Sequence, residues 1–307
     1  MAEKRKKAAE NFVPLAGRWR FEGANASYLG PTDDDNPFGL CLAPRRFRSG
    51  IITVETTLSD TAQMARVVIG YNAATGAYYA VGLGGFGYAY VIVEFIPGRG
   101  WNGVKVYGSS SQLQLKRPYH LAVEVSGQRV LLSVDSVQVV DFTLPSPLQG
   151  DQTGLYAGGT SKIEFQNFRV STDDPSIFVV MQFGAPYDAL YQEVIQPVSR
   201  RAGFKALRAD DVYRPGVILQ DIIRGIVESD VIVADITPTE NPNVFYELGY
   251  AHALQKPTIL LANRQIEKLP FDVSGYRVIF YDDTIGVKRD IEGTLEKHLE
   301  SIRCGRA

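Results

Sequence analysis

Hydrophobic and polar residues follow two different periods along this chain, and the change falls near residue 172. From about residue 12 to that point, short apolar runs partly alternate with polar positions and are separated by glycine-containing turns such as 72–76 and 126–128. This pattern predicts strands at 51–58, 66–71, 78–83, 88–95, 119–125, 129–135, 138–142, 153–157 and 163–170. Many short strands with almost no helical periodicity indicate an antiparallel β-sandwich over residues 12–172.

The residues after a short linker at 171–175 show a different pattern, in which continuous apolar strands alternate with helical segments. The predicted strands are 177–183, 205–210, 231–236, 258–261 and 277–281, and the predicted helices are 187–202, 217–228, 243–254 and 287–302. The first helix should break or restart near Pro197. Strands that are apolar along their whole length are typical of parallel sheets covered on both faces. Residues 173–307 are therefore expected to form a doubly wound, flavodoxin-like α/β domain.

Length and composition fit a protein with two ordinary globular domains. At 307 residues, the chain is longer than one hydrophobic core usually supports. It is 45% hydrophobic and 21% charged with a formal net charge of −2, which argues against a protein that binds nucleic acid through its overall field. Cys41 and Cys304 lie far apart and fit neither a disulfide framework nor a metal site, so we expect reduced thiols in a cytoplasmic protein.

No targeting or membrane-spanning segment is predicted. The longest apolar runs stay below the ~18 residues of a membrane-spanning helix, so no membrane partner is expected. Residues 1–11 contain a basic cluster at 4–7 with no apolar region after it, which does not fit a secretory signal. We expect a disordered basic tail over these residues.

Three motifs that suggest ligand binding have an ordinary structural explanation. Residues 82–87 match G-x-G-x-x-G, but a strand rather than a helix is predicted to follow, so we interpret them as a hairpin loop. The acidic run 33–35 matches no EF-hand spacing and is typical of a solvated loop. His120, His252 and His298 do not have the spacing of metal ligands, and no metal site is predicted.

The most informative run of the second domain is 241–254, which follows the strand at 231–236. Asn241 is a suitable N-cap and Pro242 is tolerated at the first helical position, so a helix should begin here. Glu247 would then lie in the early turns of this helix, beside the carboxyl end of the strand, where ligands bind in open α/β sheets. The alternative for Glu247 is a role in helix charge balance alone.

Further polar and aromatic residues fall at equivalent strand ends and extend this candidate site. In chain order they are Phe183, Gly184, Tyr187, Arg208, Asp210, Asp235, Thr237, Asn243, Tyr246 and Tyr250. The last three lie on one helical face with Glu247, because the spacing between them is three or four residues. For Tyr250 a place in the core is the alternative.

The first domain resembles a known architecture in the order of its segments, namely 17–21, 71–79, 119–125, 130–135, 153–157 and 163–170. This order resembles the concanavalin A-like jelly roll of laminin-G-type and glycoside-hydrolase-associated domains. The resemblance implies the fold but does not imply a function. Trp101, Tyr88 and Tyr90 suit either a sugar-stacking face or the core, so a carbohydrate or another small molecule is one candidate ligand of this domain.

A second resemblance covers residues 176–282 and is carried by the segments 180–183, 207–211, 229–237, 241–254, 256–260 and 269–272. This stretch resembles the TIR-like group of nucleotide-binding proteins, which is close to the nucleoside 2-deoxyribosyltransferases. Gln182 departs from the group, which commonly has proline before Phe183. The resemblance implies cleavage of an N-glycosidic bond next to ribose. Glu247 matches the essential glutamate of TIR NAD hydrolases and the nucleophile of the deoxyribosyltransferases.

The leading hypothesis from this resemblance is an NAD+ glycohydrolase that acts as an effector in bacterial antiphage defence, with NAD+ as substrate and no cofactor. Glu247 would stabilise the oxocarbenium-like charge, and its position near a helix N-terminus would help to keep it ionised. Asp235 and Asn243 would orient ribose, while Phe183 and Tyr250 would pack on the base or the nicotinamide. The active state would be a homo-oligomer or filament, switched on by the sandwich through ligand sensing or self-assembly.

Two alternatives stay open. The first is nucleoside 2-deoxyribosyl transfer or nucleotide N-glycoside hydrolysis at the same site. The second is a non-catalytic protein that binds a nucleotide signal in the α/β domain.

The leading hypothesis of NAD+ cleavage needs no dedicated general acid, because nicotinamide leaves as a neutral molecule. This suits a site with no candidate catalytic histidine.

Overall fold

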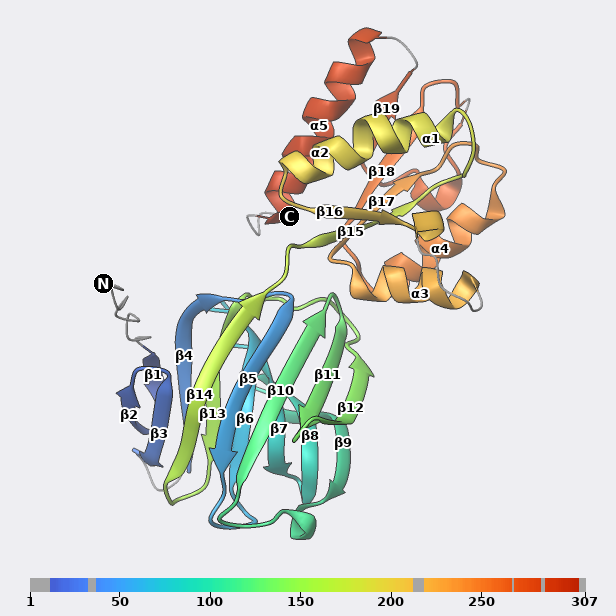
Figure 1. Ribbon diagram of the computed structural model, residues 1–307. Coiled ribbons are helices and arrows are strands. Elements are labelled where there is room, and N and C mark those ends of the chain that lie inside the picture. The colour runs from blue at the N-terminus through green and yellow to red at the C-terminus, as the bar shows by residue number, and fades with distance from the viewer. Residues whose placement is uncertain (1–11, 33–36, 212–217, 267, 283–284, 304–307) are drawn as a thin grey trace, which may run out of the picture. The chain divides into compact units, whose positions relative to one another are not determined.

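The computed structural model describes residues 12–32, 37–211, 218–266, 268–282 and 285–303 (Figure 1). The chain divides into two compact units between Asp173 and Asp174, apart from two short segments that group with the second unit. The predicted basic tail at 1–11, the acidic run at 33–35 and Cys304 lie outside the described residues. Within the described part of the chain, no helix has both the length and the apolarity that a bilayer span requires.

The first unit is a sandwich of two antiparallel β-sheets, which confirms the prediction from the alternating pattern. One sheet has the order β1-β4-β13-β6-β7-β8-β9 and the other β12-β11-β10-β5-β14-β3-β2, in a jelly-roll-like arrangement. The strands are β1 (Val13–Ala16), β2 (Arg18–Glu22), β3 (Asn25–Gly30), β4 (Phe38–Arg46), β5 (Gly50–Thr57), β6 (Met64–Tyr71), β7 (Tyr78–Gly85), β8 (Tyr88–Ile96), β9 (Gly100–Ser109), β10 (Pro118–Ser126), β11 (Arg129–Val134), β12 (Val137–Thr143), β13 (Gln152–Gly158) and β14 (Ile163–Thr172). A short 3₁₀ turn, η1 (Ser110–Gln112), follows β9.

The alternating pattern predicted nine of these strands and missed β1 to β4 and β9. The strands β1, β2 and β9 lie at sheet edges and contain no buried residue, so they lack the apolar face on which the prediction rests. In β4 three of the four buried positions hold the small residues Gly39, Cys41 and Ala43. The G-x-G-x-x-G run at 82–87 belongs to the β7–β8 hairpin, as predicted.

Apolar residues cover both faces of the first sheet, which explains why its strands alternate only in part. One face packs on the second sheet, since a Cβ at Gly39 would lie 2.5 Å from Tyr28 of β3. The strand register places Arg66 and Tyr156 together on the opposite face. There Trp101 packs against Tyr156 with ring centroids 5.0 Å apart, and the Arg66 guanidinium lies 5.6 and 5.3 Å from the two rings. Trp101 is therefore part of a packed aromatic cluster.

The second unit is built on a five-stranded parallel sheet with the order β16-β15-β17-β18-β19. The strands are β15 (Ser176–Val180), β16 (Lys205–Arg208), β17 (Val231–Asp235), β18 (Thr258–Asn263) and β19 (Val278–Tyr281). In chain order this is 2-1-3-4-5, the order of flavodoxin-like doubly wound sheets. The structure thus confirms the predicted parallel α/β sheet.

Helices cover both faces of this sheet (Figure 1). They are α1 (Tyr187–Leu190), η2 (Tyr191–Ile195), α2 (Gln196–Arg201), η3 (Ala209–Asp211), α3 (Ile218–Glu228), α4 (Pro242–Ala253), η4 (Phe271–Val273) and α5 (Ile285–Arg303). One apolar cluster joins the sheet to η2, α2 and α5, and a second joins the opposite face to α3 and α4. The central strands β15, β17 and β18 therefore bury residues on both sides, as the continuous apolar runs predicted.

The helical segment after β15 runs without interruption through α1, η2 and α2, so the predicted break near Pro197 does not occur. Its middle part, η2, has π-helical hydrogen bonds and ends just before the turn that contains Pro197. Proline has no N–H to donate to the carbonyl four residues earlier. A local π turn is one way in which a helix accommodates such a gap in its hydrogen-bond ladder.

The strand order reverses at β15, which has β16 on one side and β17 on the other. The segment after β15 leads to helices on one face of the sheet, whereas the segment after β17 leads to α4 on the other. Such a reversal leaves a crevice at the carboxyl ends of the two strands, and ligands of doubly wound folds bind there. The predicted site residues follow these strand ends.

Gly225 and Gly293 offer a matched pair of glycine-to-alanine changes in helices. A Cβ at Gly225 of α3 would lie 2.3 Å from the ring of Phe178, which is buried on β15. Gly225→Ala should therefore destabilise the second unit by about 1–3 kcal/mol, although alanine favours helices. Gly293→Ala in α5, where no atom lies within 4 Å of the added Cβ, should stabilise it by about 0.5–1 kcal/mol.

Denaturant unfolding of the full chain measures both effects. The far-UV helical signal reports the second unit, and tryptophan fluorescence reports the first unit, which holds both tryptophans, Trp19 and Trp101. The two variants should shift only the helical transition, and in opposite directions. Equal shifts in the same direction would contradict the packing of α3 on Phe178.

Candidate functional site

Asn241 fixes the start of α4 and joins it to the end of β15. Its side-chain oxygen accepts a hydrogen bond from the backbone N–H of Asn243 at 3.0 Å, and Pro242 is the first helical residue, as predicted. The side-chain nitrogen of Asn241 donates to the side-chain oxygen of Gln182 at 3.3 Å. This bond links the segment after β15 to the segment between β17 and α4, the two connections that leave the sheet at the strand-order reversal. Gln182 therefore helps to position the start of α4.

Glu247 lies in the second turn of α4, and its side chain is half-buried. Among the described residues, none forms a hydrogen bond or an ion pair with its carboxylate. Burial raises the pKa of Glu247 to about 7. The expectation that the helix N-terminus would keep this group ionised is not met, because the helix dipole acts mainly within the first turn. At neutral pH the group is therefore only partly ionised.

The other predicted residues on α4 differ in exposure. Asn243 and Tyr246 are exposed and accessible to a ligand, with 58% of Tyr246 open to solvent. Tyr250 is partly buried and packs against the apolar cluster between α4 and the sheet. The alternative of a core role therefore describes Tyr250 better than contact with a ligand.

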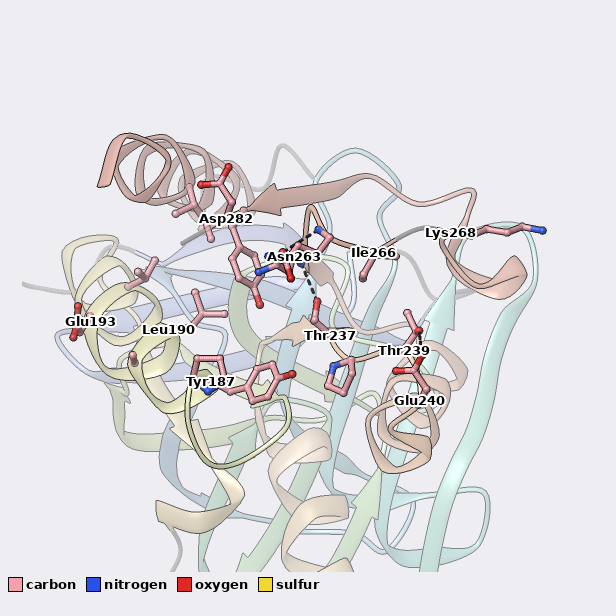
Figure 2. A pocket seen from close by; sticks show the side chains of 17 residues that line it. Tyr187, Leu190, Glu193, Thr237, Thr239, Glu240, Asn263, Ile266, Lys268 and Asp282 are labelled. Atoms are coloured by element: carbon pink, nitrogen blue, oxygen red, sulfur yellow. Dashed lines mark hydrogen bonds between the residues drawn. The ribbon is translucent and has the colours of Figure 1, made fainter. Parts of the chain in front are cut away.

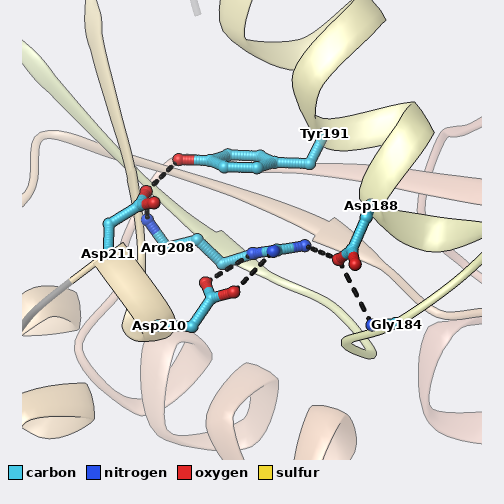
Figure 3. Close-up of polar contacts among 6 residues, drawn as sticks. All are labelled: Gly184, Asp188, Tyr191, Arg208, Asp210 and Asp211. Atoms are coloured by element: carbon cyan, nitrogen blue, oxygen red, sulfur yellow. Dashed lines mark hydrogen bonds and ion pairs between the residues drawn. The ribbon is translucent and has the colours of Figure 1, made fainter.

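Arg208 stands at the end of β16 at the centre of a closed polar network (Figure 3). The residue is almost fully buried, with only 4% of its surface exposed. Two of its nitrogens donate to Asp210 at 2.6 and 2.5 Å, and the third donates to Asp188 at 2.9 Å. The rings of Tyr191 and Phe183 cover its guanidinium carbon at 4.5 and 5.1 Å. Arg208 is thus paired within the protein, and its charge is neutralised by its own neighbours.

Asp188 and Asp211 connect this network to the backbone. Asp188 also accepts a hydrogen bond from the backbone N–H of Gly184 at 3.2 Å, so a protein carboxylate occupies the first turn after β15. Asp211 accepts from the backbone N–H of Arg208 at 3.0 Å and from the Tyr191 hydroxyl (Figure 3). Phe183 remains 49% exposed, which leaves it accessible to a flat ligand.

A cavity of about 840 Å³ opens over the carboxyl ends of β17, β18 and β19 (Figure 2). Two predicted site residues, Tyr187 and Thr237, line it. The other lining residues are Pro186, Ala189, Leu190, Glu193, Val194, Pro238, Thr239, Glu240, Asn263, Gln265, Ile266, Lys268, Tyr281, Asp282 and Ile291. Its described lining includes no residue of α4, so the cavity and Glu247 are separate features of the site.

Asp235 lies below this cavity and is fully buried at the end of β17. Its carboxylate accepts hydrogen bonds from the Tyr281 hydroxyl at 2.8 Å and from the backbone N–H of Thr237 at 3.2 Å. Burial raises the pKa of Asp235 to about 7, and these two donors limit the rise. Thr237 in turn accepts from the backbone N–H of Asn263 at 2.8 Å. Asp235 therefore positions Tyr281 and the loop after β17, whereas contact with ribose was expected.

The predicted residues thus fall into three neighbourhoods: the exposed side of α4, the Arg208 network and the cavity with Asp235 below it. Sequence reasoning missed Asp188, Tyr191, Asp211 and Tyr281. Tyr281 is the last residue of the last predicted strand. Selecting polar residues at the carboxyl ends of all strands, as was done for the earlier strands, would have included it. Asp188 and Tyr191 had no comparable signal, because helical spacing does not show that their partner is Arg208. Among the described residues, no cluster of histidine, cysteine or acidic side chains is able to hold a metal ion.

Comparison with known proteins gives likenesses of fold. No protein-family model matches the sequence, and no curated protein matches it. Carbohydrate-binding module CBM66 from Bacillus subtilis is similar at 16% identity and a TM-score of 0.44, over 53% of this chain and 95% of that chain. A B. subtilis protein with a galectin-like fold is similar at 11% identity and a TM-score of 0.37, over 52% and 87%. These two structures are β-sandwich matches.

A 2-deoxyribosyltransferase from Bacillus psychrosaccharolyticus is similar at 16% identity and a TM-score of 0.32, over 38% of this chain and 90% of that chain. Identities and scores at this level concern the fold alone. The chemistry of the site therefore has to be argued from the residues of this chain.

The raised pKa of Glu247 predicts a pH-dependent stability effect. A carboxyl group whose pKa is raised on folding holds extra protons in the folded state, so the free energy of unfolding falls as pH rises from about 4.3 to about 7. Glu247→Gln removes this penalty. The variant should match the parent protein near pH ~4 and be more stable than the parent above pH ~7.

Thermal unfolding across this pH range checks the effect, with Glu300→Gln as the control because Glu300 is an exposed glutamate on α5. A stability difference for Glu247→Gln that does not change with pH would contradict the raised pKa.

Proposed function

We propose that the second unit cleaves the N-glycosidic bond between ribose and nicotinamide in NAD+, as a TIR-like NAD+ glycohydrolase with Glu247 as the catalytic carboxylate. The observation that carries the proposal is the half-buried carboxylate of Glu247, which has no partner among the described residues and lies on the helix that borders the strand-order reversal. Ionisable groups left in such an unfavourable environment are concentrated at functional sites. The sequence resemblance supports the same residue.

Glu247 suits this reaction because breaking the bond to nicotinamide develops positive charge on the ribose. An ionised carboxylate stabilises that oxocarbenium-like charge, and partial burial strengthens the interaction because less water screens it. Water then adds to the anomeric carbon and releases a proton, and nicotinamide departs as a neutral molecule. A pKa of about 7 leaves a substantial ionised fraction at neutral pH.

Exposed side chains on α4 and in the segment after β15 would hold the rest of the substrate. Phe183 and Tyr246 are accessible aromatic rings that would stack on the adenine or the nicotinamide. The exposed amide of Asn243 would bind ribose hydroxyls. Asp235, which is fully buried beneath Tyr281, would act on the site only by positioning the loop after β17.

The biological setting is part of the same proposal. The protein would serve as a cytoplasmic effector of bacterial antiphage defence and would be active as a homo-oligomer or filament. The β-sandwich would sense a ligand or mediate the assembly. These points rest on the resemblance to TIR-like proteins. Glu247 by itself indicates which bond would be cleaved, and it does not indicate the biological role of the reaction.

A second candidate is cleavage or transfer on nucleosides without phosphate, and the Arg208 network favours it. In many α/β folds a phosphate binds to backbone N–H groups at a helix N-terminus such as the one after the first strand. Here the Asp188 carboxylate already accepts the N–H of Gly184, and it also pairs with Arg208. A phosphate at this turn would have to displace Asp188 and would meet the carboxylate of Asp210 nearby.

Nicotinamide release separates these candidates. The full chain at high concentration should release nicotinamide from NAD+, and Glu247→Gln should lower the rate by at least about 10²–10³-fold, because the amide cannot supply negative charge. Glu300→Gln removes the same charge from an exposed position on α5 and should have no effect.

Three substrates complete the assay: NAD+, nicotinamide riboside and a 2′-deoxynucleoside offered with an acceptor base. Turnover of the riboside without turnover of NAD+ would replace the first candidate by nucleoside cleavage, and base exchange would identify a transferase. Binding without turnover of any of the three would indicate a nucleotide sensor. Full activity in Glu247→Gln would contradict the catalytic role of Glu247.

A further inference from the structure

The cavity over the carboxyl ends of β17, β18 and β19 has no role in the proposed reaction. Its volume of about 840 Å³ lies within the range of small-molecule sites, which is about 300–1,000 Å³. We propose that this cavity is a second ligand site, and that its ligand is an uncharged planar ring that carries an amide group. Nicotinamide and the lactam nucleobases share this chemistry. The proposal does not rest on the cleavage of NAD+, although nicotinamide is a product of that reaction.

The charged side chains of the described lining do not point into the cavity. Figure 2 shows Glu193, Lys268 and Asp282 with their charged groups directed outward, away from the other labelled residues. The fourth charged residue, Glu240, is exposed and accepts a hydrogen bond from the Thr239 hydroxyl at 3.2 Å. The groups left to meet a ligand inside the cavity are therefore neutral, so the lining suits an uncharged molecule.

Two polar groups that line the cavity have no hydrogen-bond partner among the described residues. One is the hydroxyl of Tyr187, and the other is the side-chain nitrogen of Asn263 (Figure 2). The side-chain oxygen of Asn263 accepts a hydrogen bond from the backbone N–H of Gln265 at 2.9 Å, which fixes the orientation of this amide. The Asn263 nitrogen is therefore a free donor, whereas the Tyr187 hydroxyl is able both to donate and to accept.

A carboxamide or lactam group complements these two side chains. Its carbonyl oxygen would accept from the Asn263 nitrogen, and its N–H would donate to the Tyr187 hydroxyl. Other polar groups of the cavity are already engaged within the protein. Thr237 accepts from the backbone N–H of Asn263 at 2.8 Å, and the Tyr281 hydroxyl donates to Asp235 at 2.8 Å. Recognition of the amide would therefore depend on Tyr187 and Asn263.

Apolar and aromatic side chains form the wall around these polar groups. Val194, Tyr281 and Ile291 are buried members of the apolar cluster on this face of the sheet, and Leu190 packs against it. Tyr187 packs against the same cluster, which holds its ring in place. Aromatic side chains favour flat ring partners through stacked or edge-to-face contacts. The wall therefore suits a planar ring better than a puckered one.

Negative charge close to the cavity disfavours an anionic ligand. Burial raises the pKa of the Tyr187 hydroxyl, and the charges of Asp235 and Glu240 raise it further. Tyr187 is therefore protonated at neutral pH and keeps its donor. The same two charges would repel nicotinate, which has the shape of nicotinamide but carries a carboxylate.

Ligand-observed NMR titration of the full chain, with nicotinamide in one arm and thymine in the other, tests this proposal. Neither compound contains a bond that the proposed reaction cleaves, so binding is measurable whether or not the chain cleaves NAD+. We expect saturable binding of at least one compound, and the arm that binds identifies the source of the amide. Nicotinate, which adds a charge, and cyclohexanecarboxamide, which lacks the flat ring, should bind at least about tenfold more weakly than nicotinamide.

Matched variants locate the binding in the cavity. Tyr187→Phe removes only the hydroxyl and should weaken the binding about two- to tenfold, because one hydrogen bond is lost. Leu190→Trp places a larger ring in the cavity and should abolish the binding. Tyr246→Phe removes an exposed hydroxyl on α4, outside the lining, and should leave the affinity unchanged.

Four results would overturn the proposal. They are no binding of either compound, equal binding of nicotinamide and one of its two analogues, an unchanged affinity in both Tyr187→Phe and Leu190→Trp, and an equal loss in Tyr187→Phe and Tyr246→Phe. Far-UV circular dichroism that matches the parent protein shows that each variant is folded.

Discussion

The reversal of strand order at β15 is the constraint on which the rest of the second unit depends. It sends the chain to α1 on one face of the sheet and to α4 on the other, and both connections leave at the same edge. Polar side chains gather there because the central strands are buried on both faces and are apolar along most of their length, so polar residues fall at or just after the strand ends. The bond between Asn241 and Gln182 then holds the two connections together across the reversal.

Burial gives similar pKa values to two carboxyl groups that have different roles. Asp235 is fully buried but accepts hydrogen bonds from Tyr281 and Thr237, so it is part of the structure that holds the loop. Glu247 is less buried, yet no described side chain stabilises its charge. Leaving a carboxylate unpaired costs stability, and proteins accept this cost chiefly where a substrate or partner supplies the missing interaction.

Most of the architecture could be predicted from the sequence because the spacing of apolar residues reflects which positions are buried, and burial of apolar surface also packs the sheets. It missed β1, β2 and β9, which are edge strands without a buried face. It also grouped all strand-end residues into one site, because periodicity shows at which edge a side chain lies but not which neighbour it contacts. Arg208 closing on Asp188 and Asp210 is such a tertiary contact, and so is Tyr281 covering Asp235.

The pH dependence of kcat/KM for nicotinamide release tests the role of Glu247 most directly, because it reports the ionisation of the free enzyme's catalytic group. If the ionised, half-buried carboxylate drives the reaction, the rate should rise with pH and level off above an apparent pKa of about 7. A rate that is already maximal well below neutral pH would show that the carboxylate at work is an ordinary solvated one, and would contradict the assignment of Glu247.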